Sequence, residues 1–190
     1  MSTNAKESIL AAARQAAQAH GYGGLNFRDV AAEVGIKAAS IYHHFPSKAD
    51  LGAAVARRYW EDTARDLDEL LADTDDAASA LRRYPWIFRR SLECGNRLCL
   101  CSFMSAEYDD LPDAVKTEVQ AFAEVNVAWL GKALVAAKQV SPEHAEKRAR
   151  AIFSAVSGAQ LMARSRADIS IFDELIDSYQ NAGLLPAEAV

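Results

Sequence analysis

Apolar side chains recur three or four residues apart along most of the chain. Within the first twenty residues this spacing is kept by Ile9, Leu10, Ala13, Ala16 and Ala17. A repeat near 3.6 residues places apolar positions on one face of a helix, whereas a strand requires a repeat of two. No segment shows the two-residue repeat, and only 9 Gly and 5 Pro interrupt 190 residues. The pattern therefore predicts an all-α fold.

Capping residues, glycines and prolines divide the pattern into about nine helices. Asn26 and Ser47 are good N-caps, and Ser141-Pro142 is a cap followed by a proline at the first helical position. Gly35 stands where a tight turn between two helices requires a left-handed residue. The predicted helices run from Thr3 or Asn4 to about His20, from Asn26 to Gly35, Lys37 to His44, Ser47 to Leu71, Ala77 to Glu93 with a kink at Pro85, Leu98 to Asp109, Pro112 to Val140, Ser141 to Arg166 and Ser170 to Asn181.

The second and third helices have the spacing of a helix-turn-helix motif. In the third, Ala38, Ile41 and Phe45 cluster on the arc that would face a small core. The opposite arc carries small side chains and hydrogen-bond donors and no acid, which suits contact with a groove floor and with phosphates. A solvated face of a helical bundle is the alternative. The predicted DNA-contacting residues are Arg28, Lys37, Ala38, Ala39, Ser40, Tyr42, His43, His44 and Lys48.

The charge distribution is compatible with such a motif. The net charge is −5, which argues against a general nucleic-acid coat protein. The first fifty residues nevertheless carry +1 and the remainder −6. No apolar run approaches the roughly 20 residues that span a bilayer, and the N-terminus lacks a signal-peptide pattern. We therefore expect a cytoplasmic protein without a membrane partner.

Residues 27–51 resemble the signature of the TetR family. The matching features are Asp29-Val30-Ala31, Gly35, Ser40-Ile41-Tyr42, His44-Phe45 and Ser47-Lys48. The resemblance implies a nine-helix regulator with a DNA-binding domain over 1–47 and an effector-binding and dimerisation domain over 48–190. It also implies a repressor of double-stranded operator DNA that a small molecule releases. In the family, residues matching Ser40, Tyr42, His44 and Lys48 touch DNA, mostly its phosphates, and those at Ala38 and Ala39 help to set the operator.

The last two helices are predicted to form a homodimer seam. Residues 152–164 are similar to the penultimate helix of the family, which usually pairs with its mate in a four-helix bundle. Gly158 weakens a helix by about 1 kcal/mol, and close approach of another helix would explain it. A core seam within the chain is the alternative. The predicted interface comprises Phe153, Val156, Gly158, Leu161, Phe172, Leu175, Ile176 and Tyr179.

Three cysteines, Cys94, Cys99 and Cys101, lie within eight residues. An odd count argues against a secreted disulfide framework. The cysteines could be buried small hydrophobes, a metal site of unusual spacing, or a reactive thiol at the start of a helix beside Arg97. Cys99-Leu100 with Ala106-Glu107 and Pro112 is similar to a TetR subgroup that includes electrophile- and oxidant-responsive repressors. Leu98, where that subgroup often has Gly, and the additional Cys101 depart from its pattern.

A noncovalent effector pocket is predicted beside the thiol hypothesis. Aromatic residues at helical spacing could line it, although such residues are more often ordinary core. The predicted effector residues are Cys99, Cys101, Trp86, Phe103, Met104, Tyr108, Phe122, Asn126 and Trp129.

Two other classes of protein remain as alternatives. A helical thiol peroxidase or disulfide reductase could use the cysteines, but the chain lacks Cys-x-x-Cys, a Gly-rich phosphate loop and paired catalytic carboxylates. A helical protein-binding module is the third class. We expect a DNA-binding regulator with no catalytic activity, no cofactor and no metal.

Overall fold

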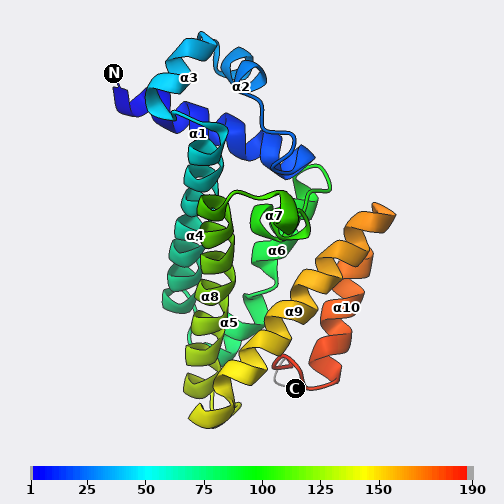
Figure 1. Cartoon of the computed structure of the whole chain (residues 1–190). Helices are drawn as coiled ribbons and strands as arrows, with labels where there is room; N and C mark the ends of the chain where they lie inside the picture. Colours follow the sequence, from blue (N-terminus) through cyan, green and yellow to red (C-terminus); the bar gives the residue numbers. More distant parts are fainter. Residues whose placement is uncertain (1, 188–190) are drawn as a thin grey trace. The chain divides into compact units, whose positions relative to one another are not determined.

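The computed structural model describes residues 2–187, with side chains from residue 5 onward, and these residues form helices joined by short turns (Figure 1). The all-helical prediction is confirmed. The side chains of Thr3 and Asn4, predicted as caps, lie outside the described ones. The helices are α1 (Ser2–His20), α2 (Phe27–Val34), α3 (Ala38–His44), α4 (Lys48–Ala72), α5 (Ala77–Arg83), α6 (Trp86–Glu93), α7 (Leu100–Ala106), the 3₁₀ helix η1 (Tyr108–Asp110), α8 (Asp113–Ala136), α9 (Pro142–Arg166) and α10 (Ser170–Asn181).

The predicted helix over Ala77–Glu93 is two helices. α5 starts at the cap Asp76, whose Oδ1 accepts from the Ser79 amide at 2.8 Å. It ends before Tyr84-Pro85, and α6 begins at Trp86. Proline has no N–H to donate to the preceding turn, so the kink expected at Pro85 becomes a break. This break explains why the described part of the chain has ten α helices where about nine were expected.

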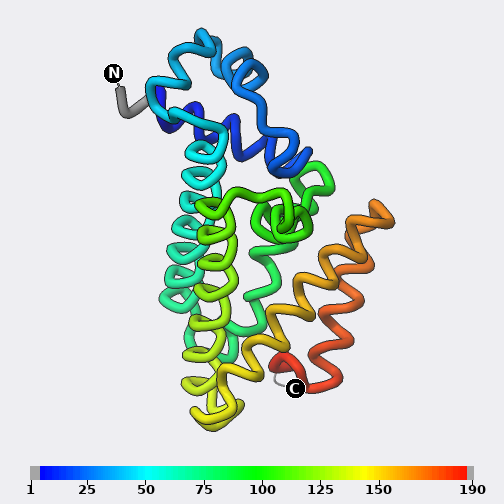
Figure 2. Tube along the Cα trace, in the orientation of Figure 1, coloured from blue at the N-terminus to red at the C-terminus, as the bar shows by residue number. Residues whose placement is uncertain are grey.

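The chain divides into two compact units. The first comprises Met1–Glu61 and Cys99–Phe122. Its core joins the N-terminal helices to α7, because Ile9, Ile41, Leu51 and Leu100 are all fully buried. Within this unit the turn between α1 and α2 lies against the end of α7, although some 85 residues separate them (Figure 2).

The second unit comprises Asp62–Leu98 and Ala123–Val190. In it α9 packs on α10 and on α6. Its buried polar groups are paired across helices: the Tyr84 hydroxyl donates to Asn126 Oδ1 at 2.9 Å, and Gln160 Nε2 donates to the Phe88 carbonyl at 2.6 Å. Such bonds specify which faces of the helices meet, because a buried unpaired amide is unfavourable.

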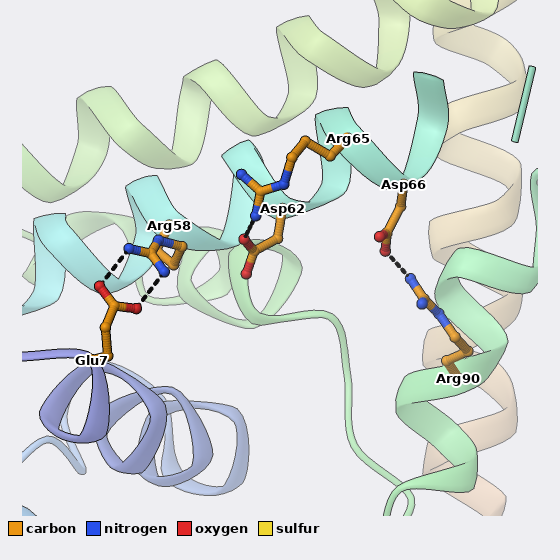
Figure 3. Close-up of polar contacts among 6 residues, drawn as sticks. All are labelled: Glu7, Arg58, Asp62, Arg65, Asp66 and Arg90. Atoms are coloured by element: carbon orange, nitrogen blue, oxygen red, sulfur yellow. Dashed lines mark hydrogen bonds and ion pairs between the residues drawn. The ribbon is translucent and has the colours of Figure 1, made fainter. Parts of the chain in front are cut away.

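Ion pairs extend from the exposed side of α4 in both units (Figure 3). In the first unit Arg58 holds Glu7 of α1 through two bonds of 2.5 and 2.7 Å. In the second unit Arg90 of α6 pairs with Asp66. These side chains are about half exposed, so each pair contributes no more than about 1 kcal/mol and mainly sets helix orientation.

Candidate nucleic-acid interface and effector region

The helix-turn-helix has the caps that the sequence predicted. Asn26 caps α2, with its side-chain oxygen accepting from the Arg28 amide at 2.8 Å. Gly35 ends α2 in the left-handed region at φ 74°, and the Ile36 amide returns to the Ala31 carbonyl at 3.0 Å. A residue with a Cβ is disfavoured at this φ, so glycine permits the short turn into α3.

α3 is buried on one side and open on the other. Ile41 and Phe45 are 0% and 3% exposed and anchor the helix in the first unit. Ala38 and His44 are half-buried at the border. The helix contains no acidic residue. The predicted DNA-contacting residues that are exposed are Arg28, Lys37, Ala39, Ser40, Tyr42 and His43.

Tyr42 projects from this open side with a fixed ring. Its side chain is 57% exposed, yet its ring packs on that of Phe27 with centroids 4.6 Å apart. Phe27 is itself buried at the start of α2. An exposed aromatic ring held by one buried ring loses less freedom when its hydroxyl binds a partner.

Lys48 lies at the first turn of α4, as predicted, but it already has a partner. Ser47 caps this helix, because its hydroxyl accepts from the Asp50 amide at 3.1 Å. Lys48 Nζ donates to the Gly23 carbonyl at 3.0 Å and lies 4.6 Å from the centroid of the Tyr22 ring. An ammonium has three donors, so the bond to Gly23 fixes its position and leaves donors for an anion.

Glu107, which the sequence places only within the resemblance to the cysteine-containing subgroup, meets the same turn from the other side. Its carboxylate accepts from the amides of Tyr22 at 2.6 Å and Gly23 at 3.1 Å. That resemblance gave Glu107 no structural role, and the local signal lies in the turn, whose three glycines, Gly21, Gly23 and Gly24, can direct consecutive amides at one anion. The identity of that anion could not be read from the turn.

The three cysteines differ in their exposure to solvent. Cys99 does stand at a helix start, where its sulfur accepts from the Ser102 amide at 3.4 Å. Burial, however, raises the pKa of the Cys99 thiol, and the bonds from Ser102 only partly oppose this effect. Burial raises the pKa of Cys101 still further. Cys99 and Cys101 therefore have the burial of small hydrophobic side chains, the first of the three alternatives, and Cys94 is exposed.

The predicted effector residues fall in both units. Cys99, Cys101, Phe103, Met104, Tyr108 and Phe122 belong to the first unit, and Trp86, Asn126 and Trp129 to the second. Trp86 and Tyr108 are 51% and 45% exposed, which corrects their placement in an internal cavity. Trp86 instead borders a surface cleft of about 430 Å³ with Arg83 and Phe172.

Asn126 and Trp129 do lie in the interior of the second unit. The Trp129 ring stacks on Tyr84 with centroids 5.8 Å apart and planes 18° apart. Tyr84 in turn donates to Asn126. Trp129 Nε1 is buried without a hydrogen-bond partner. Such an orphaned donor is unfavourable by about 1–3 kcal/mol, so the cluster can accept a polar atom from elsewhere.

The predicted dimer residues divide by burial. Val156, Phe172 and Ile176 are 0%, 1% and 8% exposed in the chain alone, so these three side chains pack mainly in the core of their own chain. Gly158 and Leu161 are exposed, and Leu161 is 57% accessible beside the equally prominent Met162. Phe153, Leu175 and Tyr179 are half-buried.

Membranes and metal ions are two other kinds of partner. Across residues 2–187, no helix has the length and apolar character to cross a membrane. In the same part of the chain, no three His, Cys, Asp or Glu side chains are grouped to hold a metal ion.

Comparison with known proteins identifies the type of the DNA-binding domain and the fold of the chain. Residues 9–55 match the model of bacterial regulatory proteins of the tetR family. A TetR regulator from Legionella pneumophila is 28% identical with a TM-score of 0.87, over 93% of this chain and 96% of that one. One from Agrobacterium tumefaciens has the same identity and TM-score, over 95% and 97%. E. coli NemR in its reduced form shares the fold at 22% identity and a TM-score of 0.82, over 98% and 100%. No curated protein matches. Residues 9–55 therefore form a helix-turn-helix DNA-binding domain of the tetR type, and the chain as a whole has the fold of TetR-family transcription regulators.

Proposed function

We propose that the protein is a homodimeric repressor that leaves its operator when a small molecule binds its C-terminal domain. In this proposal residues 1–47 hold the DNA and residues 48–190 bind the effector and the second copy. The observation that carries the proposal is the open side of α3. Lys37, Ser40 and His43 are exposed there together and no carboxylate accompanies them.

The chemistry of this side suits the major groove. Ala39 lets the helix approach the groove floor and the methyl group of thymine, while Ser40 can bond a base edge or a phosphate. Lys37 and His43 supply donors to the strands on either side, and the fixed Tyr42 hydroxyl reaches the backbone. Arg28, Ala38, His44 and Lys48 complete the proposed contact set.

A second copy is required to place two such helices about one DNA turn, roughly 34–36 Å, apart. The exposed part of α9 supports this role, because Leu161 and Met162 are large apolar side chains next to the open Gly158. Phe153, Leu175 and Tyr179 would line the edge of the same interface. Burying this apolar surface would favour association.

The effector proposal rests on the cluster of Tyr84, Asn126 and Trp129. An effector with a hydrogen-bond acceptor would satisfy Trp129 Nε1, and a flat group would suit the stacked rings. A covalent alternative keeps Cys99 as the sensor. It requires local opening first, because the thiol is 2% exposed.

Selection of bound duplexes from a random DNA library, with the purified full-length chain, tests the proposed function. We expect an enriched site with two-fold symmetry and half-sites about 10 base pairs apart. Ser40→Ala should change the preferred bases within each half-site. Failure to enrich any sequence, or a site without symmetry, would contradict the proposal.

The effector proposal needs a separate test. Compound libraries can be screened for release of the enriched duplex, comparing the wild type with Trp129→Phe. A compound that uses the orphaned donor should release the wild type at concentrations at least about fivefold lower, because a hydrogen bond contributes about 1 kcal/mol. Equal potency on the two proteins would remove Trp129 from the site.

A further inference from the structure

The turn between α1 and α2 is held from three directions within the first unit. Its amides at Tyr22 and Gly23 donate to the carboxylate of Glu107 at 2.6 and 3.1 Å. Its Gly23 carbonyl accepts from Lys48 Nζ at 3.0 Å. The turn leads directly into α2, so its position sets the position of the helix-turn-helix.

The Tyr22 side chain forms the third contact. A Cβ on Gly52 of α4 would lie 2.7 Å from the Tyr22 ring and 3.2 Å from Val115 of α8. The ring therefore occupies a space that exists only because residue 52 is glycine. Burial raises the pKa of Tyr22, which is consistent with a ring partly removed from water.

The backbone around the Glu107 carboxylate also depends on glycines. Gly21 has φ 70°, and a Cβ there would lie 2.4 Å from both Glu107 oxygens. Gly23 would place its Cβ 3.4 Å from Oε1. The backbone thus forms a concave donor site for one carboxylate, of the kind in which successive amides bind an anion. A side chain at Gly21 would obstruct it.

Glu107 follows the last residue of α7, whose first turn is capped by Cys99. The carboxylate is therefore the terminal contact of a short helix that belongs to the 99–122 segment. We propose that Glu107 is a positioning residue for DNA binding: its carboxylate, seated on the Tyr22 and Gly23 amides, holds the helix-turn-helix in its binding posture, and displacement of α7 releases it. This inference rests on the proposed function.

The direction in which a substitution of Glu107 changes DNA affinity distinguishes a positioning role from a purely electrostatic effect of its charge. Removing a carboxylate from a DNA-binding protein ordinarily strengthens binding, because it reduces repulsion from phosphates. Glu107→Gln removes one negative charge, as does the matched control Asp109→Asn in the exposed part of η1. We expect the control to bind the selected operator as tightly as the wild type or slightly more tightly. Glu107→Gln should bind at least about fivefold more weakly, because the competent posture is less populated.

Two further measurements complete the test on the full chain. Amide hydrogen exchange at Tyr22 and Gly23 should accelerate in Glu107→Gln and stay unchanged in Asp109→Asn. Gly21→Ala keeps the net charge but displaces the carboxylate, so it should show the same loss of affinity. Circular dichroism checks that the helices persist in each variant.

The outcomes separate the two proposals. If the wild type selects no DNA sequence, the proposed function fails, and the amide exchange still reports on the contact. If the wild type binds its operator and Glu107→Gln binds as well as Asp109→Asn, the positioning role is overturned. Unchanged exchange at Tyr22 and Gly23 would overturn it as well.

Discussion

Replacing Gly158 by alanine should change the stability of the folded chain and the stability of the proposed dimer in opposite directions. It lies in the interior of α9, and a Cβ built there meets nothing within 4 Å. In the isolated chain Gly158→Ala should therefore stabilise the helix by roughly 0.5–1 kcal/mol, the usual difference between alanine and glycine in a helix. If the exposed side of α9 packs against a second copy, the added methyl group meets that copy instead.

The expected penalty in the dimer is larger than the gain in the helix. Overpacking a close helix contact destabilises it by about 1–3 kcal/mol, and 1.4 kcal/mol is a tenfold change in an equilibrium constant. Each copy contributes one Gly158 to a symmetric interface, so two methyl groups are added. We expect Gly158→Ala to weaken dimerisation by about tenfold or more.

Gly131 provides the matched control. It also lies inside a helix, α8, and a Cβ there would be 3.9 Å from the Ala145 side chain, an ordinary contact. Gly131→Ala should raise thermal stability and leave dimerisation unchanged. Sedimentation equilibrium gives the dimer dissociation constant, and the dependence of Tm on protein concentration gives an independent measure. A Gly158→Ala protein that dimerises as tightly as Gly131→Ala would refute the proposed interface.

Two further substitutions test other parts of the molecule. Lys48→Ala should weaken binding to all duplexes. In a salt titration it should reduce the slope of log affinity against log salt concentration by about 1 for each phosphate that Lys48 neutralises. An unchanged slope would mean that Lys48 binds only the Gly23 carbonyl and no phosphate. Glu118 should stabilise the folded protein at neutral pH and lose this effect in acid. Burial alone would raise the pKa of its carboxyl group, but hydrogen bonds from Arg57 and Trp60 outweigh burial and lower the pKa below the usual 4.5. Because a lowered folded pKa stabilises the protein above the unfolded pKa, the Tm advantage of wild type over Glu118→Gln should be full at neutral pH and shrink below about pH 4.5. An advantage that is constant with pH would contradict this assignment.

Local signals predicted the helix-turn-helix closely. Asn26, Gly35 and Ser47 act through bonds to residues within five positions, so residue type and spacing suffice to place them. Pro85 was recognised for the same reason, although its effect was underestimated. The open and buried sides of α3 follow from the helical repeat alone.

Tertiary contacts account for what the sequence could not predict. The place of Cys99 at a helix start allowed a reactive thiol as one alternative, but it does not reveal the burial by distant residues that raises the pKa of this thiol. Val156 and Phe172 have the same apolar character as Leu161, and only the packing of α9 on its neighbours decides which of them is covered. The bond from Tyr22 to Glu107 spans 85 residues and has no periodic signal.

The two ends of α7 link the exposure of Cys99 to the position of the α1–α2 turn. Cys99 is buried at one end and Glu107 is seated on the α1–α2 turn at the other, so exposing the thiol requires a movement that strains the seat. DNA should favour the conformation in which Glu107 binds the turn amides. It should therefore reduce the population of the conformation in which α7 is displaced and Cys99 is exposed, because a ligand of one conformation depletes the other. Saturating operator should slow alkylation of Cys99 by N-ethylmaleimide several-fold, measured by mass spectrometry, while the exposed Cys94 in the same molecules reacts at an unchanged rate. Glu107→Gln should speed the reaction of Cys99 in the absence of DNA. Equal alkylation rates for Cys99 with and without operator would show that α7 moves independently of the helix-turn-helix.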